Sequence, residues 1–236
     1  MLFNILLQAD AAQAIEAVAT PVQQTQELSF SVIDMAFKGG WLMIPLFLLS
    51  IITIYLFGMK WWAIRKASQV DNTFMRDIED YIREGKIKSA IKLCQDANTP
   101  VARLVEKGID RIGRPLGDIQ IAVENTGNVE VARLEKGLPM LATIAGGAPM
   151  IGFLGTVIGM VQAFFNMAQA GSNIDITLLS GGIYTAMVTT VAGLVVGIMA
   201  YFGYNYLSAQ VSDLVYKMES TTIEFLDLLQ EPKENK

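Results

Sequence analysis

Three apolar runs without a charged residue divide the chain. They cover residues 39–59, 137–174 and 176–212, and a single aspartate separates the last two. A helix rises ~1.5 Å per residue, so about 20 apolar residues cross the ~30 Å hydrocarbon core of a bilayer. In lipid, backbone groups must find their hydrogen bonds within their own helix. The pattern therefore predicts three membrane-spanning helices, of which the last two form an antiparallel hairpin.

The second and third runs are longer than a bilayer requires. They hold 38 and 37 residues, so as helices they would measure ~50 Å or more. We expect both to leave the membrane as continuous helices and to pack against the segment between the first two spans. In that segment Phe74, Ile78 and Ile82 recur at helical spacing, and Gly85 and Pro100 divide the pattern into short helices.

The basic residues predict the orientation. No lysine or arginine precedes Lys38, fourteen lie in residues 60–136, and none lies in residues 137–216. By the positive-inside rule the block rich in lysine and arginine is cytoplasmic, so the N-terminus is periplasmic and the C-terminus cytoplasmic. The fold class predicted is all-α: a polytopic membrane protein with three transmembrane helices, two of them long and extending into a cytoplasmic helical bundle.

These patterns give the chain seven expected segments. They are a periplasmic N-terminal segment with an interfacial helix (1–38), transmembrane helix 1 (39–63), a cytoplasmic helical region (64–136), transmembrane helix 2 (137–170), a periplasmic turn (171–175), transmembrane helix 3 (176–208) and a cytoplasmic tail (209–236). The stretch Ala12-Gln13-Ala14 is similar to a signal-peptide cleavage site, but no basic region precedes it. Removal of the N-terminus stays open.

Composition excludes several classes of function. A hydrophobic share of 52% with only 17% charged residues is typical of a membrane protein. The chain has no histidine, which excludes histidine metal sites and serine–histidine nucleophiles, and it has no phosphate-binding loop. Its net charge of −5 and the lack of a long basic tract argue against a nucleic-acid partner. We expect no enzymatic activity, no cofactor and no metal site, and we expect Cys94 to be a packed thiol.

Small residues form stripes along the second and third spans. Small residues let helix backbones approach closely in lipid, where no hydrophobic force drives helices together. The glycines predicted to pack helix against helix are Gly152, Gly155, Gly159, Gly182, Gly193 and Gly197. The small residues cover more of each helix than one contact consumes, so we also expect self-assembly.

Four threonines are the candidate polar site of the two spans: Thr156, Thr185, Thr189 and Thr190. Each could simply bond to a backbone carbonyl, or together they could line a polar but neutral cavity, and the residues alone leave both readings open. None of the three apolar runs contains Asp, Glu, Lys, Arg or His, the residues that normally mark a proton path in a membrane. A titratable group would have to come from a partner.

Two motifs resemble a known family. Residues 148–160 read APMIGFLGTVIGM, and residues 179–194 read LSGGIYTAMVTTVAGL. At this spacing they are similar to the MotA/TolQ/ExbB proton-channel family, and most of all to its ExbB branch. The order of spans and of the large cytoplasmic segment is also similar over nearly the whole chain.

The resemblance implies a homopentamer in the bacterial inner membrane. Its second and third helices would enclose a pore that holds the single membrane helices of an ExbD-like partner dimer, which brings the titratable Asp. Thr156 and Thr190 would face the pore and hydrogen-bond to that Asp or to water. Proton flow would turn one ring of subunits against the other, and a TonB-like energy transducer would carry the work to outer-membrane transporters. The resemblance does not identify the cargo or the direction of rotation.

Two positions depart from the family pattern. ExbB and TolQ relatives commonly carry Glu at the position of Thr185 and Pro at that of Gly181. The departure leaves ExbB-like, TolQ-like and gliding-motor roles open, whereas a flagellar-type stator would usually need a longer cytoplasmic segment. The alternative outside these motors is a membrane scaffold that assembles a complex without conducting protons.

Overall fold

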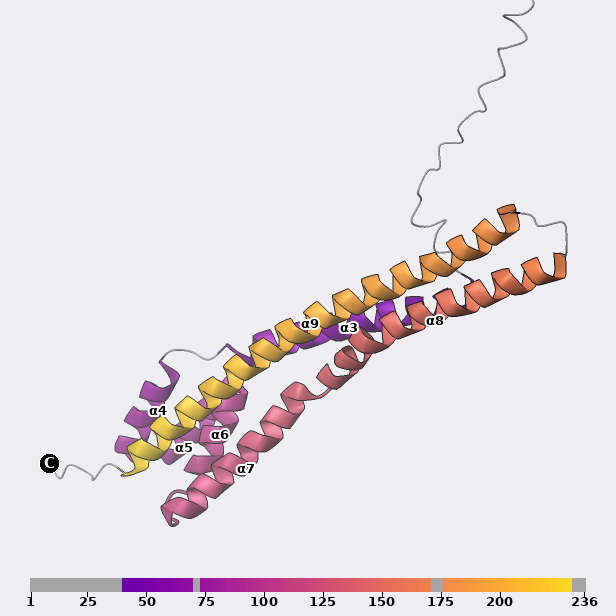
Figure 1. Ribbon diagram of the computed structural model, residues 1–236. Helices are drawn as coiled ribbons and strands as arrows, with labels where there is room; N and C mark the ends of the chain where they lie inside the picture. Colours follow the sequence, from indigo (N-terminus) through magenta and orange to yellow (C-terminus); the bar gives the residue numbers. More distant parts are fainter. Residues whose placement is uncertain (1–39, 70–72, 171–175, 231–236) are drawn as a thin grey trace, which may run out of the picture. The chain divides into compact units, whose positions relative to one another are not determined.

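The computed structural model describes residues 40–69, 73–170 and 176–230, and within them every regular element is a helix (Figure 1). The helices are α3 (Met43–Ala67), α4 (Phe74–Arg83), α5 (Ile87–Ala97), α6 (Pro100–Ile109), α7 (Leu116–Glu135), α8 (Leu138–Ala170) and α9 (Ile176–Gln230). Three helical stretches are long and apolar enough to cross a membrane: Met43–Ala67, Leu116–Gln169 and Leu179–Gln230. The predicted fold class is confirmed. The expected interfacial helix, the cleavage motif and the turn at 171–175 lie outside the described residues.

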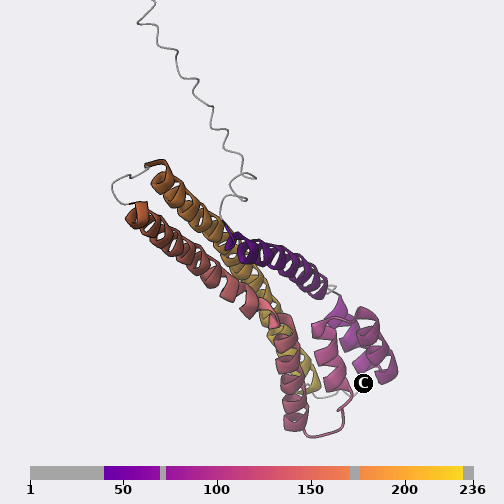
Figure 2. The ribbon, with the colours of Figure 1, turned by 90° about the vertical axis from the view of Figure 1, so that its right-hand side faces the viewer.

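Helix α9 is a single unbroken element of 55 residues. At ~1.5 Å per residue it is about 80 Å long, far more than a bilayer needs. Its first half packs along α8 and α3, and its second half packs against α6, α7 and α4 (Figures 1 and 2). The second half buries one apolar stripe at helical spacing, made of Leu207, Val211, Leu214, Met218 and Phe225. The predicted continuation of the third span is therefore confirmed.

The second long arm bends where the second apolar run begins, and the long continuous helix predicted for that run is α8, of 33 residues. Helix α7 ends at Glu135 and α8 begins at Leu138. Gly137 between them has a φ of +95°, a left-handed conformation that glycine adopts without steric cost. Pro139 follows two residues later, and proline suits the first turn of a new helix because its nitrogen needs no partner there. Helix α7 continues the arm beyond this joint (Figure 2).

The basic end of α3 is attached to the same joint. The Lys60 ammonium group donates to the backbone oxygens of Arg133 and Leu134, each at 3.4 Å. These carbonyls belong to the last turn of α7, where the helix dipole favours a positive charge. Lys60 therefore holds the first long helix against the point at which the second arm bends.

The short helices α4 to α6 form a core with α7 and the second half of α9. Helix α6 begins with Thr99, whose hydroxyl accepts a hydrogen bond from the Ala102 amide at 3.2 Å. Gly108 of α6 lies against the Phe225 ring of α9, which leaves no room for a side chain. Cys94 is fully buried among these helices, and burial raises the pKa of its thiol to about 12. The prediction of a packed thiol is confirmed.

Candidate functional site

The glycines predicted to pack the hairpin all lie where α8 meets α9. A Cβ atom added to any of them would lie within 2.9 Å of an atom of the opposite helix. The pairs are Gly152 with the Thr189 oxygen, Gly155 with the Thr189 side chain, Gly159 with Ala186, Gly182 with Ala163, Gly193 with the Ala148 oxygen and Gly197 with Pro149. These glycines therefore set the distance between the two helices.

The closest part of this contact brings backbone against backbone. A Cβ atom on Gly193 would lie 2.6 Å from the Ala148 oxygen and 2.9 Å from the Cα of Gly152. One turn away, Pro149 has no N–H group. The Ala145 carbonyl therefore lacks the hydrogen bond that residue 149 of a helix normally donates to it. That carbonyl oxygen lies 3.0 Å from the place a Cβ would take on Gly197. The middle of the hairpin thus has almost no freedom to accept larger residues.

Two of the candidate threonines lie at this contact. The Thr190 hydroxyl donates to the Gly152 oxygen of α8 at 2.9 Å. Thr189 is buried, and its hydroxyl lies 2.7 Å from the Ala186 oxygen and 3.4 Å from the Gly152 oxygen. The Thr190 hydroxyl thus donates across the crossing, whereas the single hydroxyl hydrogen of Thr189 has its nearer acceptor, the Ala186 oxygen, on its own helix.

The other two threonines are half-buried beside this point. Thr156 lies one turn after Gly152 on the same face of α8, and its hydroxyl donates to the Phe153 oxygen at 2.6 Å. Thr185 lies one turn before Thr189 on α9, and its side chain makes no hydrogen bond within the described ranges 40–69, 73–170 and 176–230. The structure thus places the four predicted threonines around one crossing of α8 and α9.

The crossing is polar but has no charge of its own. Helix α8 carries no ionisable carboxylate, lysine or arginine along its 33 residues, and α9 carries none before Asp213. The hydroxyls of Thr156, Thr189 and Thr190 use their hydrogens on backbone carbonyls, so their oxygens keep lone pairs that can accept a hydrogen bond. The site can bind a neutral donor, but it cannot take up and release a proton by itself.

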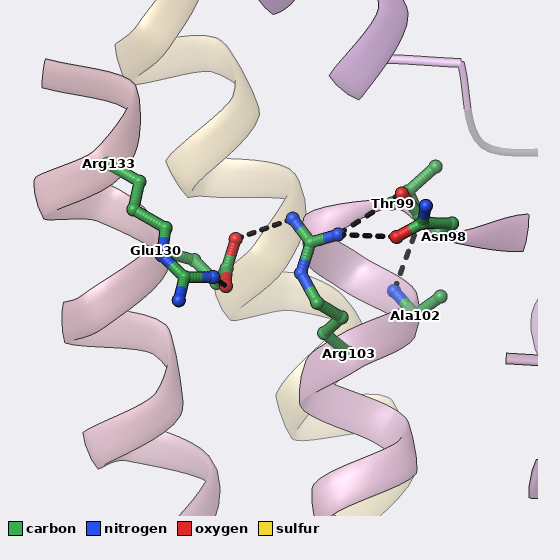
Figure 3. Close-up of polar contacts among 6 residues, drawn as sticks. All are labelled: Asn98, Thr99, Ala102, Arg103, Glu130 and Arg133. Atoms are coloured by element: carbon green, nitrogen blue, oxygen red, sulfur yellow. Dashed lines mark hydrogen bonds and ion pairs between the residues drawn. The ribbon is translucent and has the colours of Figure 1, made fainter. Parts of the chain in front are cut away.

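A second polar cluster joins α6 to α7 (Figure 3). The Glu130 carboxylate, with only 4% of its side chain exposed, receives Arg103 through one oxygen and Arg133 through the other, each at 2.6 Å. Arg103 also donates to the Asn98 side chain at 2.9 Å and to the Asn98 carbonyl at 3.2 Å. One carboxylate therefore connects the start of α6 to the last part of α7.

Sequence reasoning missed this cluster. Glu130 is one of many charged residues in the segment 60–136, and its burial has no mark in the sequence. Arg133 follows Glu130 at a spacing that allows an ion pair on one helix. Nothing local marks Arg103, 27 residues earlier in the chain, as the second partner. Only the packing of α6 on α7 brings the two groups together.

Comparison with known proteins decides the family. Residues 96–220, which include both motifs and the Arg103–Glu130 pair, match the MotA/TolQ/ExbB proton channel family. The chain belongs to this family. Similar proteins include a putative biopolymer transport protein ExbB homolog of Methanothermobacter thermautotrophicus, 28% identical over 80% of this chain and 67% of that protein. A putative ExbB-like protein 1 of Synechocystis is 32% identical over 74% of this chain and 70% of its own length. The biopolymer transport protein ExbB of Neisseria meningitidis serogroup A is 27% identical over 73% and 83%.

As a member of the MotA/TolQ/ExbB family, the chain is a membrane protein of a transport and proton-channel family. Large apolar side chains cover the outer faces of its long helices. Phe153 of α8 and Phe202 of α9 are both about two thirds exposed, as are Ile54 and Trp62 of α3. A soluble monomer rarely exposes so much apolar surface, whereas lipid or further subunits can cover it.

The buried carboxylate of this family member supports a first prediction. Glu130→Gln removes the negative charge and leaves Arg103 without an ionic partner. Breaking a buried pair in this way costs several kcal/mol. Arg103 is one third exposed, so we expect a smaller loss of about 2 kcal/mol, or roughly 5 °C in the unfolding midpoint. Thermal unfolding of the whole chain in detergent, followed by circular dichroism, measures the difference.

The matched control is Glu135→Gln on the same helix. Glu135 is exposed, so its substitution should change the midpoint by less than a third of that amount. Equal midpoints for the two variants would show that the Glu130 pair does not hold α6 to α7.

Proposed function

We propose that the chain is an ExbB-like subunit of a proton-driven motor of the inner membrane. Five copies surround the single membrane helices of an ExbD-like partner, and the proton motive force drives one part of the assembly against the other. A TonB-like energy transducer carries the resulting work to transporters of the outer membrane. The relatives named as biopolymer transport proteins support this assignment.

The observation that carries the proposal is the set of hydroxyls at a crossing without charge. Thr156 and Thr190 flank Gly152, where α8 and α9 meet. A proton path through a membrane needs a titratable group, and neither helix supplies one within its apolar part. Hydroxyls can nevertheless stabilise such a group when it belongs to a partner. The aspartate that the ExbD-like partner is proposed to bring is a group of this kind.

The direction of the hydrogen bonds suggests how the site responds to a proton. A protonated partner carboxyl group can donate to the oxygen of Thr156 or Thr190, because these hydroxyls already donate to Phe153 and Gly152. A deprotonated carboxylate needs a donor instead, which requires a hydroxyl to rotate away from its carbonyl. The two protonation states of the partner therefore favour different threonine rotamers, and this difference couples proton movement to the contact between chain and partner.

The proposed topology follows from the distribution of basic residues. The N-terminus and the turn at 171–175 lie in the periplasm, residues 64–136 and the tail from 209 lie in the cytoplasm, and the spans are 39–63, 137–170 and 176–208. In this orientation α4 to α7 and the second half of α9 form the cytoplasmic part of the subunit. The joint at Gly137 then lies at the cytoplasmic end of the second span.

One observation favours a second candidate function, that of a membrane scaffold that does not conduct protons. The hydroxyls of Thr156, Thr189 and Thr190 all have backbone acceptors within the chain. A threonine whose hydroxyl is satisfied by the backbone needs no further role. In that case the crossing would only hold the hairpin together.

Proton flux separates the two candidates. The chain and the single-span protein that co-purifies with it in mild detergent are reconstituted into liposomes that contain a pH-sensitive dye. We expect a membrane potential to drive proton uptake only when both proteins are present, since the titratable group belongs to the partner. Flux through the chain alone would contradict the proposed division of roles, and no flux from the complete assembly would favour the scaffold.

A further inference from the structure

A pocket of about 260 Å³ lies between the end of α3 and the middle of α9. Its walls are Trp61, Ile64 and Arg65 of α3 and Tyr206, Leu207 and Gln210 of α9. Ile64 and Leu207 are almost completely buried and form an apolar floor. Four side chains with hydrogen-bond donors surround this floor, and no acidic side chain lines it. The pocket is therefore suited to an anion that has an apolar part.

Arg65 is positioned to serve as the cation of this pocket. Its guanidinium carbon lies 5.3 Å from the centre of the Trp61 ring, close enough for a cation–π contact that holds the side chain in place. Arg65 makes no salt bridge within the part of the chain that the structure describes. Its charge is thus available to a ligand, and the planar guanidinium group can donate two parallel hydrogen bonds to a phosphate.

The pocket lies at the level where a bilayer surface is expected. The uncharged run of α3 ends at Met59, and Lys60 and Arg65 are the first charges after it. Trp61 and Tyr206 are aromatic residues with a polar group, the type enriched at membrane–water interfaces. On the membrane side of the pocket α9 exposes Met199 and Phe202, which are 42% and 67% accessible. An apolar surface therefore leads directly to the cationic pocket.

We propose that this pocket binds the headgroup of an anionic phospholipid. The phosphodiester accepts hydrogen bonds from Arg65, Gln210 and the Tyr206 hydroxyl, and the acyl chains lie along the exposed apolar face of α9. The pocket volume of about 260 Å³ lies between that of a single water, ~30 Å³, and that of a site for a whole drug-sized ligand, ~300 Å³ or more. A space of this size suits a headgroup whose acyl chains remain outside. Basic pockets between membrane helices are a known type of lipid site.

Native mass spectrometry of the assembly in a neutral detergent tests the proposal. The purified full chain, with its partner, is titrated with dioleoylphosphatidylglycerol and, separately, with zwitterionic dioleoylphosphatidylcholine. We expect phosphatidylglycerol to bind with a lower Kd than phosphatidylcholine and to saturate at one molecule for each copy of the chain. Arg65→Gln should raise the Kd for phosphatidylglycerol about tenfold, because it removes a charge-assisted hydrogen bond.

Lys66→Gln is the matched control. Lys66 is the next residue and lies 5.7 Å from the ring centre of Trp62, but it does not line the pocket. If the pocket binds the headgroup, Lys66→Gln changes the Kd by less than twofold. An equal rise in the Kd for phosphatidylglycerol in both variants would show a general attraction of anionic lipid to basic residues and would overturn the proposal. Tyr206→Phe gives a second measurement, with a smaller rise in the Kd, because it removes one hydroxyl and keeps the ring.

Three other outcomes also overturn the proposal. The first is that inorganic phosphate displaces phosphatidylglycerol at equal concentration, which would make the pocket a phosphate site. The second is that the two lipids bind equally well. The third is that the assembled wild-type protein binds no lipid at any concentration of the titration, which would mean that a neighbouring copy or the partner covers the pocket.

Discussion

Replacing Gly193 with leucine is expected to disrupt the hairpin of α8 and α9. The added Cβ alone would lie 2.6 Å from the Ala148 oxygen and 2.9 Å from the Gly152 Cα. Backbone atoms on both sides cannot turn away as a side chain can, so the two helices must separate. We expect a cost of about 3 kcal/mol or more, which corresponds to a fall of roughly 10 °C in the unfolding midpoint. Size-exclusion chromatography should show loss of the native assembly.

Gly181→Leu provides the matched control on the same helix. A Cβ added to Gly181 meets no atom within 4 Å, and leucine is well tolerated in lipid. The control should therefore keep a midpoint close to that of the wild-type protein. An unchanged midpoint for Gly193→Leu would show that the two backbones do not meet as closely as the structure indicates.

The double variant Thr156→Val, Thr190→Val is expected to abolish most proton flux and to leave the assembly intact. Valine keeps the shape of threonine but removes the hydroxyl. Hydrogen bonds between membrane helices contribute only ~0.6 kcal/mol on average, so the hairpin should survive. A partner carboxyl group left without its hydrogen bond loses ~1–3 kcal/mol, which lowers the flux about tenfold to a hundredfold. Dye-based flux in liposomes and size-exclusion chromatography measure the two effects.

Thr143→Val tests whether any threonine of α8 would give the same result. Its hydroxyl donates to the Pro139 oxygen at 2.9 Å, and its side chain is exposed away from the crossing. The flux should stay within about twofold of the wild-type value, because no proton path is proposed there. Full flux in the double variant would mean that the hydroxyls at Gly152 are only structural.

The membrane helices could be predicted because their signal is a direct result of bilayer physics. A charge inside lipid is costly, so an uncharged run of sufficient length defines a span without any knowledge of its neighbours. The glycines at 152 and 193 could be named for a similar reason, since close approach in lipid requires small residues. Their actual partners, such as the Ala148 oxygen, depend on the register of α8 against α9, which the sequence did not specify.

The remaining features depend on local geometry or on distant partners. The joint at Gly137 has a local signal, a glycine followed two residues later by proline at the start of the second apolar run, but the sequence does not give the angle at which α7 continues from it. The buried Glu130 could not be recognised, because Arg103 lies on another helix. The pocket around Arg65 exists only because α3 packs beside α9. In each case packing determines the role of a residue that looks ordinary in the sequence.

The continuity of α9 gives the protein a mechanical property. Between Gly197, which touches Pro149 in the hairpin, and Phe225, which touches Gly108 of α6, the helix rises about 42 Å. It contains no proline, and after Gly203 it contains no glycine, so it lacks the usual points at which a helix bends. The helix therefore behaves as a stiff rod. A shift along the helix axis by one ångström at Gly203 is therefore expected to move the Phe225 ring by nearly the same distance against α6.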